Sequence, residues 1–529
     1  MDSGVESGTD GAVAGGTEVS GAGGVRTESA GRRAVLVRRV LVGAVLGCFV
    51  LGGVLVVLPD GGRRPPPSPG PMARAVTAVG SGAPASLPDL VALIGDREAH
   101  LRAHPGDVRS WAELGTAYVE RGRRTAEPGF YPKADAALRT SLKGRPKGNT
   151  EAFRGMAVLA NTRRDFRAAR EWGEAAVASS PKRWSVYPAL IDAYRGLGDY
   201  KGARRALAKL VELPSGGGAS GNGASGSRAS GSGPAAQVLV RAGLVYRDRG
   251  WREDSAAALS DAAALAATPA ERADCLVRVG ESAWERGEAA ESLRAFEAAL
   301  RADPGEHAAR AGQGRALAAL GRDSEALLAY QSALAKQPLP RYALELGELY
   351  ESLGLGGAAR AQYDVLRARV REGDAVGVDE ELVLGLFEAD HGDAGDAVRR
   401  LRGEWARHPS AAVADALGWA LHRDGKDKEA VGFATRATDR VRGGGARVAL
   451  YSFHRGVIER GVGNGSGARR HLGEALRISP VFSPLLVPVA LRALEELGEP
   501  PAVRAPGRAP VPGGGGGDEG GGEGGSARR

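Results

Sequence analysis

Apolar residues recur at intervals of three and four along most of the chain between residues 88 and 498. This interval is the period of amphipathic α-helices. In residues 317–338, two such stretches meet at Gly321, which suits the C-terminal end of a helix, and the second stretch ends before Pro338. The pattern therefore predicts an all-α chain built from helical hairpins.

Small residues repeat in step with these hairpins. Glycines spaced by 34, 33, 38, 33 and 38 residues are Gly280, Gly314, Gly347, Gly385, Gly418 and Gly456. Alanines spaced by 33, 38, 33 and 38 residues are Ala326, Ala359, Ala397, Ala430 and Ala468. Prolines spaced by 41, 35 and 33 residues mark the first half: Pro105, Pro146, Pro181 and Pro214. Ladders that run in one register indicate a structural repeat, with about ten units between residues 108 and 480.

These units resemble the tetratricopeptide repeat, a 34-residue helix-turn-helix with the pattern W-x2-L-G-x2-Y…A-x3-F…P. The resemblance is carried by Trp111, Leu114, Gly115, Tyr118, Ala134, Leu138 and Pro146 in the first unit, and by Gly314, Ala326, Tyr330, Ala333 and Pro338 in a later one. It implies a right-handed α-solenoid whose concave face binds a protein or peptide. Lone helical stretches at 88–105 and 488–498 are expected to cap its ends.

An uncharged run near the N-terminus predicts a transmembrane helix within residues 34–59. Val40 to Leu58 contains 19 residues without a charge, which span roughly 28 Å as a helix, close to the thickness of a bilayer core. Five arginines precede the run (26, 32, 33, 38 and 39) and three follow it (63, 64 and 74). This bias favours a cell-membrane protein with a cytoplasmic N-terminus and extracytoplasmic repeats.

Three short motifs in this segment offer alternatives. The sequence ending at Cys48 resembles a lipoprotein cleavage box, but the apolar run continues beyond it, which favours a transmembrane cysteine. Arg32 and Arg33 resemble a twin-arginine signal, although neighbouring arginines favour a barrier to translocation. Gly43 and Gly47 form a G-x-x-x-G face that predicts a homodimer through the membrane helix, or a chance match in a glycine-rich run.

Composition divides the rest of the chain, since 80 of its 529 residues are glycine and they are unevenly distributed. Low-complexity composition predicts a disordered tail at 1–33, a Pro-rich linker at 60–86, a flexible Gly/Ser linker at 215–234 and a disordered Gly-rich tail at 499–529. The predicted repeat blocks are then residues 87–214, with the N-terminal capping helix, and residues 235–498, with the C-terminal one.

No catalytic constellation emerges from the sequence. Walker, H-E-x-x-H and C-x-x-C motifs are absent, and the G-x-G-x-x-G match at 221–226 lies in low-complexity sequence. Asp96, His100 and His104 share one helix face, which suits a metal or, alternatively, a solvated surface. The net charge of +8 comes from interspersed charges, which gives weak support for nucleic-acid binding. We therefore predict no enzyme, no cofactor, no metal and no nucleic-acid partner.

The family's ligand surface comes mainly from the first helix of each pair, and aligning the repeats places an excess of acids there. Between residues 274 and 423, nine acids face four bases. The candidate partner-binding residues on this face are Asp274, Glu281, Trp284, Glu285, Glu345, Glu348, Glu351, Trp419 and Phe453. They predict capture of a basic partner segment, with the tryptophans and the phenylalanine as anchors. The alternative is a solvated face with buried aromatic residues.

Together these features predict a non-catalytic, membrane-anchored protein-interaction scaffold. A second hypothesis comes from residues 101–118, LRAHPGDVRSWAELGTAY, which look like membrane-anchored repeat subunits of cytochrome c assembly. That likeness implies an assembly factor for a complex of the cell envelope.

Overall fold

The computed structural model describes residues 69–213, 233–440 and 445–498. The predicted tail at 1–33, the transmembrane helix at 34–59, most of the Gly/Ser linker at 215–234 and the tail at 499–529 lie outside these residues. Within the described part, no helix is both long and apolar enough to cross a membrane. The same part contains α-helices and a single short 3-10 turn, with no strand.

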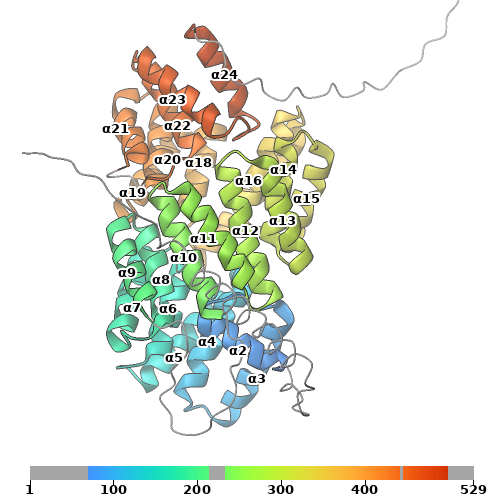
Figure 1. Cartoon of the computed structure of the whole chain (residues 1–529), viewed down its shortest axis with the longest axis vertical. Helices are drawn as coiled ribbons and strands as arrows, with labels where there is room; N and C mark the ends of the chain where they lie inside the picture. The colour runs from blue at the N-terminus through green and yellow to red at the C-terminus, as the bar shows by residue number, and fades with distance from the viewer. Residues whose placement is uncertain (1–68, 214–232, 441–444, 499–529) are drawn as a thin grey trace, which may run out of the picture. The chain divides into compact units, whose positions relative to one another are not determined.

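Ten helix pairs follow one another along the described chain (Figure 1). The pairs are α4 (Val108–Thr125) with α5 (Phe130–Gly144), α6 (Thr150–Thr162) with α7 (Phe166–Ser179), α8 (Tyr187–Gly196) with α9 (Tyr200–Glu212), α10 (Gly233–Asp248) with α11 (Arg252–Leu265), α12 (Pro269–Glu285) with α13 (Ala289–Ala302), α14 (His307–Ala319) with α15 (Asp323–Lys336), α16 (Pro340–Ser352) with α17 (Gly356–Asp374), α18 (Glu381–His391) with α19 (Ala394–Arg407), α20 (Ala411–Arg423) with α21 (Asp427–Thr438), and α22 (Ala449–Gly461) with α23 (Gly465–Ile478). Single helices α3 (Leu87–Ala103) and α24 (Leu486–Glu496) flank the pairs, and a 3-10 turn, η1 (Trp184–Val186), leads into α8. For the residues that the structure describes, the prediction of an all-α fold of repeated helix pairs is confirmed.

The ladder glycines explain how the two helices of a pair approach each other. A Cβ added at Gly314 would lie 2.7 Å from the Tyr330 ring, and one at Gly347 would lie 2.2 Å from the Tyr363 ring. Ala326 and Ala359, one turn before these tyrosines, are almost fully buried. Close-packed interiors leave no room for an extra carbon, so the small residue is required by the approach of the second helix.

The turn between paired helices needs a left-handed residue. Gly321 has φ +74°, and the following Arg322 N–H bonds the Leu317 carbonyl at 2.9 Å, which closes the end of α14. Such a conformation at a helix end usually falls to glycine. In the turn between α6 and α7, Arg164 takes the same place with φ +62°.

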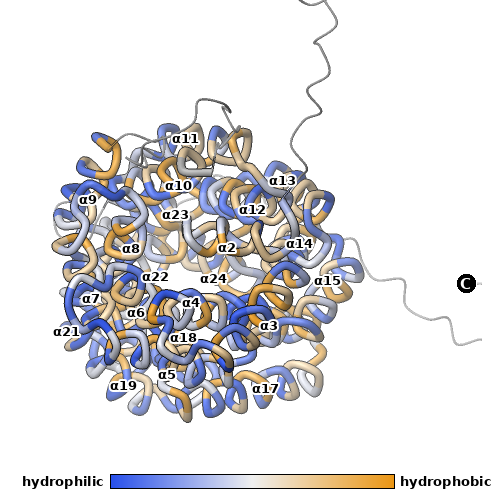
Figure 2. The backbone as a smooth tube through the Cα atoms, turned by 90° about the horizontal axis from the view of Figure 1, so that it is seen from below, coloured by the Kyte–Doolittle hydropathy of each residue, from blue (hydrophilic) through white to orange (hydrophobic). Residues whose placement is uncertain are grey.

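The first helices of the pairs form one continuous surface. Each contacts the first helix of the next pair, from α4 through α22. In Figure 2, the second helices, such as α7, α9, α13 and α15, lie toward the outside of the projection, and first helices such as α4, α18 and α22 lie nearer its centre. We call the surface made by the first helices the inner surface; it corresponds to the predicted concave face.

Turns of early pairs also contact the connections between later pairs. The Arg124 guanidinium donates to Asp303, 179 residues away, at 2.8 Å. The Asp379 N–H bonds the Arg163 carbonyl at 2.9 Å, and the Tyr200 hydroxyl accepts from the Ala411 N–H, 211 residues away, at 3.2 Å. We call this row of contacts the seam. It joins the first five pairs to the later ones, which no local sequence pattern indicated.

Residues 71–81 correct the prediction of a Pro-rich linker at 60–86, because they form helix α2 (Pro71–Ser81). Proline is tolerated in the first turn of a helix, where its missing N–H has no partner anyway, and Pro71 takes that position. The alanine-rich sequence that follows favours a helix. Ala75, Ala78 and Val79 are buried against the first repeats, so tertiary contacts complete what propensity began.

Candidate functional site

Arg315 is the hub of the inner surface in the second half of the chain. It projects from α14 with its side chain 10% exposed and donates to Glu281 of α12 at 2.9 Å. Its other nitrogens contact Glu345 of α16 at 2.9–3.2 Å, and the Tyr330 hydroxyl donates to the same carboxylate at 2.9 Å. Burial opposes the charge of Arg315, but the two carboxylates raise its pKa well above the ordinary value. Three successive first helices are therefore joined by charge.

Most of the predicted acidic residues have a basic partner of this kind. Glu285 accepts from Arg247 of α10 at 2.7 and 2.9 Å, and Asp274 pairs with Arg278 at 3.4 Å. Burial works against the charge of Asp274, yet Arg278 and nearby arginines lower its pKa. The predicted excess of negative charge is thus largely neutralised within the inner surface, since the sequence count did not include ion pairs between repeats.

One group of carboxylates keeps an excess of negative charge. Glu348 and Glu351 of α16 meet the same His391 of α18, at 3.9 and 3.3 Å. The Tyr363 hydroxyl donates to Glu351 at 2.8 Å, and Tyr363 stacks on His391. Burial raises the pKa of Glu348, with His391 acting against it. We call Glu348, Glu351 and His391 the carboxylate cluster; it is the part of the predicted site that remains suited to a basic ligand.

Two of the three predicted aromatic anchors are inside the protein. Trp419 is 3% exposed, donates its indole N–H to Asp390 at 3.0 Å and stacks on His454 at 4.2 Å. Phe453 is fully buried in the same core. The prediction that Trp419 and Phe453 are partner-binding anchors is therefore wrong. Their large rings fill the space between neighbouring repeats instead. Trp284 is half-buried beside Arg315 and stays a candidate.

The first half of the inner surface presents one guanidinium without a carboxylate partner. Arg195 pairs with Asp248 at 2.6 Å, and Arg241 pairs with Asp192 at 2.9 Å. Arg154 of α6 instead donates to the backbone carbonyl of Val79 in α2 at 2.9 Å. Helix α2 covers this position, which the sequence did not reveal because the segment containing α2 was assigned to a linker.

The metal-like motifs resolve into ordinary contacts. His100 pairs with Asp107 at 3.0 Å and stacks on His104, while Asp96 lies 3.7 Å from Arg97. Elsewhere among the described residues, Asp379, Glu404 and His408 bring ligand atoms within 4.8 Å of one another. Arg407 donates to the carboxylates of Asp379 and Glu404, at 2.9 and 2.8 Å. Its guanidinium therefore already balances part of the negative charge of this group.

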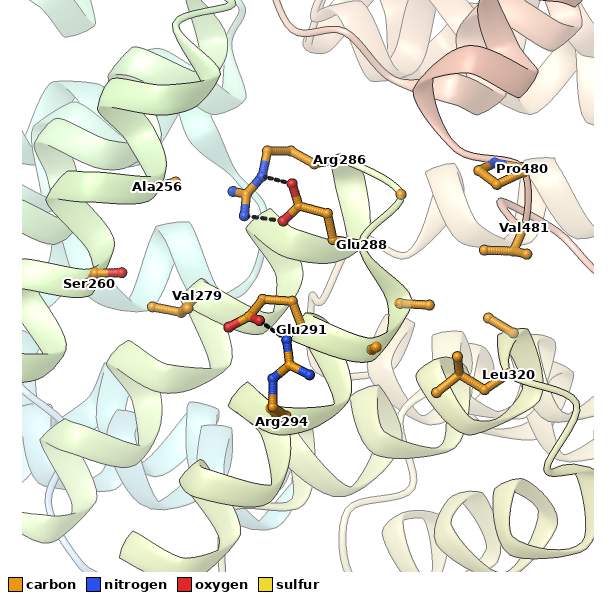
Figure 3. Close-up of a pocket in the computed structure, with 14 residues that line it drawn as sticks. Ala256, Ser260, Val279, Arg286, Glu288, Glu291, Arg294, Leu320, Pro480 and Val481 are labelled. Carbon is orange, nitrogen blue, oxygen red and sulfur yellow. Dashed lines mark hydrogen bonds and ion pairs between the residues drawn. The ribbon is translucent and has the colours of Figure 1, made fainter. Parts of the chain in front are cut away.

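A cavity of about 770 Å³ opens beside the turn between α12 and α13 (Figure 3). Pro480 and Val481 line it on the side of the C-terminal repeats. Its charged side chains pair within the wall, Arg286 with Glu288 and Arg294 with Glu291. Apart from Ser260, the remaining side chains of the lining are apolar, and the cavity lies beside a contact of the seam, where Gly287 approaches Ser479.

Comparison with known proteins agrees with this architecture. Residues 277–339, which span most of α12 to α15, match the family model of the tetratricopeptide repeat. The segment 277–339 therefore contains tetratricopeptide repeats. No curated protein sequence matches it.

Among solved structures, a tetratricopeptide repeat protein from Parabacteroides merdae is 16% identical over 50% of this chain and 99% of its own, with a TM-score of 0.30. MamA is 21% identical over 35% and 97%, with a TM-score of 0.26. Yeast Tom70 is 11% identical over 73% and 95%, with a TM-score of 0.32. At these TM-scores the superpositions carry no information about function.

Proposed function

We propose that this tetratricopeptide repeat protein is a non-catalytic scaffold that holds a protein or peptide partner on its inner surface. The observation that carries the proposal is the continuous surface of first helices, with its carboxylate cluster. Tetratricopeptide repeats use such surfaces to bind proteins, and binding needs no catalytic group. The proposal includes a right-handed solenoid, the handedness expected for the repeat.

The partner segment that suits the carboxylate cluster is basic. Glu348 and Glu351 are two carboxylates that share one histidine, and the side chain of Glu351 is 44% exposed. An arginine or lysine from a partner would add the second positive charge that the cluster lacks. Partly exposed charges of this kind contribute to partner choice and to association rate, and salt weakens them.

A membrane tether completes the proposal. The uncharged run Val40–Leu58 supports a single-pass anchor, and the arginine bias supports a cytoplasmic N-terminus with the repeats outside. We expect an alkaline phosphatase fused after Arg529 to be active. A fluorescent protein that folds only in the cytoplasm should be dark when it is fused at the same position. The reverse pattern would place the repeats in the cytoplasm.

Affinity capture from detergent-solubilised membranes tests the binding function. The full chain should retain a partner in low salt and release it as salt rises. Glu348→Lys combined with Glu351→Lys should lower recovery about tenfold, the effect of losing roughly 1.4 kcal/mol of binding free energy. Glu345 is left intact because Arg315 and Arg341 depend on it.

Asp364→Lys is the matched control. This acid lies on the second helix α17, is 76% exposed and pairs only weakly with Arg367 at 3.3 Å. Recovery should not change in this variant. Equal recovery of the partner by the double variant and by the control would show that the carboxylate cluster is not the binding site.

A further inference from the structure

Helix α2 lies on the inner surface of the first repeats. It contacts α3, α4 and α10, and Figure 2 shows it inward of α10 and α12. Ala75, Ala78 and Val79 face the core formed with Leu114, Tyr118 and Met156. A helix laid in the groove of a helical array is a recurring mode of peptide recognition. The chain therefore supplies its own occupant for a part of the surface where a partner is expected.

The end of α2 rests on a buried cation. Arg154 is 6% exposed, its Nη1 donates to the Val79 carbonyl at 2.9 Å, and its Nε has no partner. Burial lowers the pKa of Arg154, with Glu151 acting in the opposite direction. A neutral carbonyl is a weaker partner for a buried guanidinium than a carboxylate, which accepts charge-assisted and bidentate hydrogen bonds. Arg154 would therefore bind a carboxylate more strongly than it binds the Val79 carbonyl.

Apart from the contact with Arg154, α2 packs through small side chains and through Met72 and Val76, which are only partly buried. Its buried face consists of alanines and one valine, and most of its remaining residues are exposed or half-buried. Arg74 pairs with Asp89 of α3 at 2.6 Å, but the arginine side chain is 42% exposed. Helices of 11 residues, the length of α2, are not stable alone in water. A segment that satisfied Arg154 better could displace it.

We propose that the surface beneath α2 is a docking site for a partner helix, and that α2 occupies it until the partner displaces it. The partner helix has alanine-sized residues on one face, as α2 does. It ends in a carboxylate, which replaces the Val79 carbonyl at Arg154. This deepens the proposed function, on which it rests, because it names a partner class for the first half of the inner surface.

The test measures binding of a fluorescein-labelled peptide of residues 69–79, with a free carboxylate at Val79, to the full chain by anisotropy. In the variant Ala75→Glu, a charge on the buried face should release α2. The peptide should bind this variant at least about tenfold more tightly than it binds the wild-type chain. Ala73→Glu, on the exposed face, is the matched control and should bind as the wild type does.

The role of Arg154 has its own comparison. A peptide amidated at Val79 should bind Ala75→Glu about tenfold more weakly than the free acid, and adding Arg154→Gln should remove that difference. Equal affinity of Ala75→Glu and Ala73→Glu for the acid, or equal affinity of acid and amide, would overturn the proposal.

Hydrogen exchange on the unmodified chain provides a test that needs no variant. Saturating peptide should accelerate exchange of the α2 amides and leave those of α20 unchanged. Unchanged protection of α2 at saturation would also overturn the proposal. Loss of peptide binding while partner capture at the carboxylate cluster persists would remove this inference alone and leave the proposed function in place.

Discussion

His391 shows how one titratable residue can act on both stability and binding. Its side chain is 11% exposed and lies between aromatic rings of α17 and α18 and two carboxylates of α16. Burial opposes its charge, but Glu348 and Glu351 raise its pKa above the ordinary value. A protonated His391 therefore links α16 to α18 and also lowers the negative charge that a basic partner would meet.

The stability effect of His391 has a defined direction. A histidine whose pKa is raised by folding stabilises the fold below its ordinary pKa of about 6.5, and this contribution disappears as pH rises through the folded pKa. We expect His391→Asn to reduce the free energy of unfolding by roughly 1 kcal/mol more at pH 6 than at pH 8.5, measured by urea denaturation.

His307 provides a control of opposite sign. Burial and Arg124 lower its pKa, so it favours the folded state when neutral and loses that contribution as pH falls. The free energy of unfolding of His307→Asn, measured relative to that of the wild type, should therefore be higher at pH 6 than at pH 8.5. The same pH trend in both variants would contradict the assignment of His391.

At the scale of the helix pair, spacing in the sequence translates directly into contact. Five of the six ladder glycines face a side chain sixteen positions later, as Gly385 faces Leu401 and Gly456 faces Leu472, whereas Gly418 faces the Ala434 backbone and Phe433. In the pair α12–α13, Ser292 takes the place of the ladder alanine, and its hydroxyl donates to the Gly280 carbonyl at 2.9 Å. Serine is tolerated between the two helices because its hydroxyl has a hydrogen-bond acceptor there.

Two glycine substitutions should separate packing from helix propensity. Gly347→Ala would place a carbon 2.2 Å from Tyr363 and should destabilise the protein by about 1–3 kcal/mol. Gly432→Ala, in the exposed face of α21 with no atom within 4 Å, should stabilise it by about 1 kcal/mol. Thermal unfolding measures both, and shifts of equal sign would show that the ladder does not mark the helix contact.

At the scale of the whole molecule, the seam distinguishes this protein from a linear array of repeats. In a linear array, each repeat contacts only its neighbours and stability is a sum of nearest-neighbour contributions. Here Arg124, with its side chain 5% exposed, pairs with Asp303 and Glu306 in a distant repeat. Burial raises the pKa of Glu306, which Arg124 offsets, so this carboxylate depends on the seam.

Arg124→Ala should weaken the coupling between the early and late repeats. It leaves two largely buried carboxylates without their cation, at a cost of about 3 kcal/mol. We expect urea unfolding, followed by circular dichroism, to become less cooperative. Arg322→Ala is the control, because this arginine in the turn of α14–α15 is 45% exposed and pairs with Glu325 three residues later, so unfolding should hardly change. Equal effects of the two variants would mean that the seam contributes nothing.

Local physics explains what could be predicted from the sequence alone. Helices, turns and pair contacts depend on residues within about twenty positions, so apolar periodicity, Gly321 in its left-handed turn and the Gly347–Ala359 spacing were sufficient to predict ten helical hairpins. The acidic residues of the inner surface were also placed on the first helices by that spacing.

Tertiary structure decided which of those residues are available. Whether an acid on the inner surface carries free charge depends on partners 30 to 38 residues away, as with Arg315 and Glu345 or Arg247 and Glu285. Whether Trp419 is an anchor depends on how tightly neighbouring repeats close around it. The docking of α2 and the seam join still more distant segments. Such contacts have no local period, so only the folded chain reveals them.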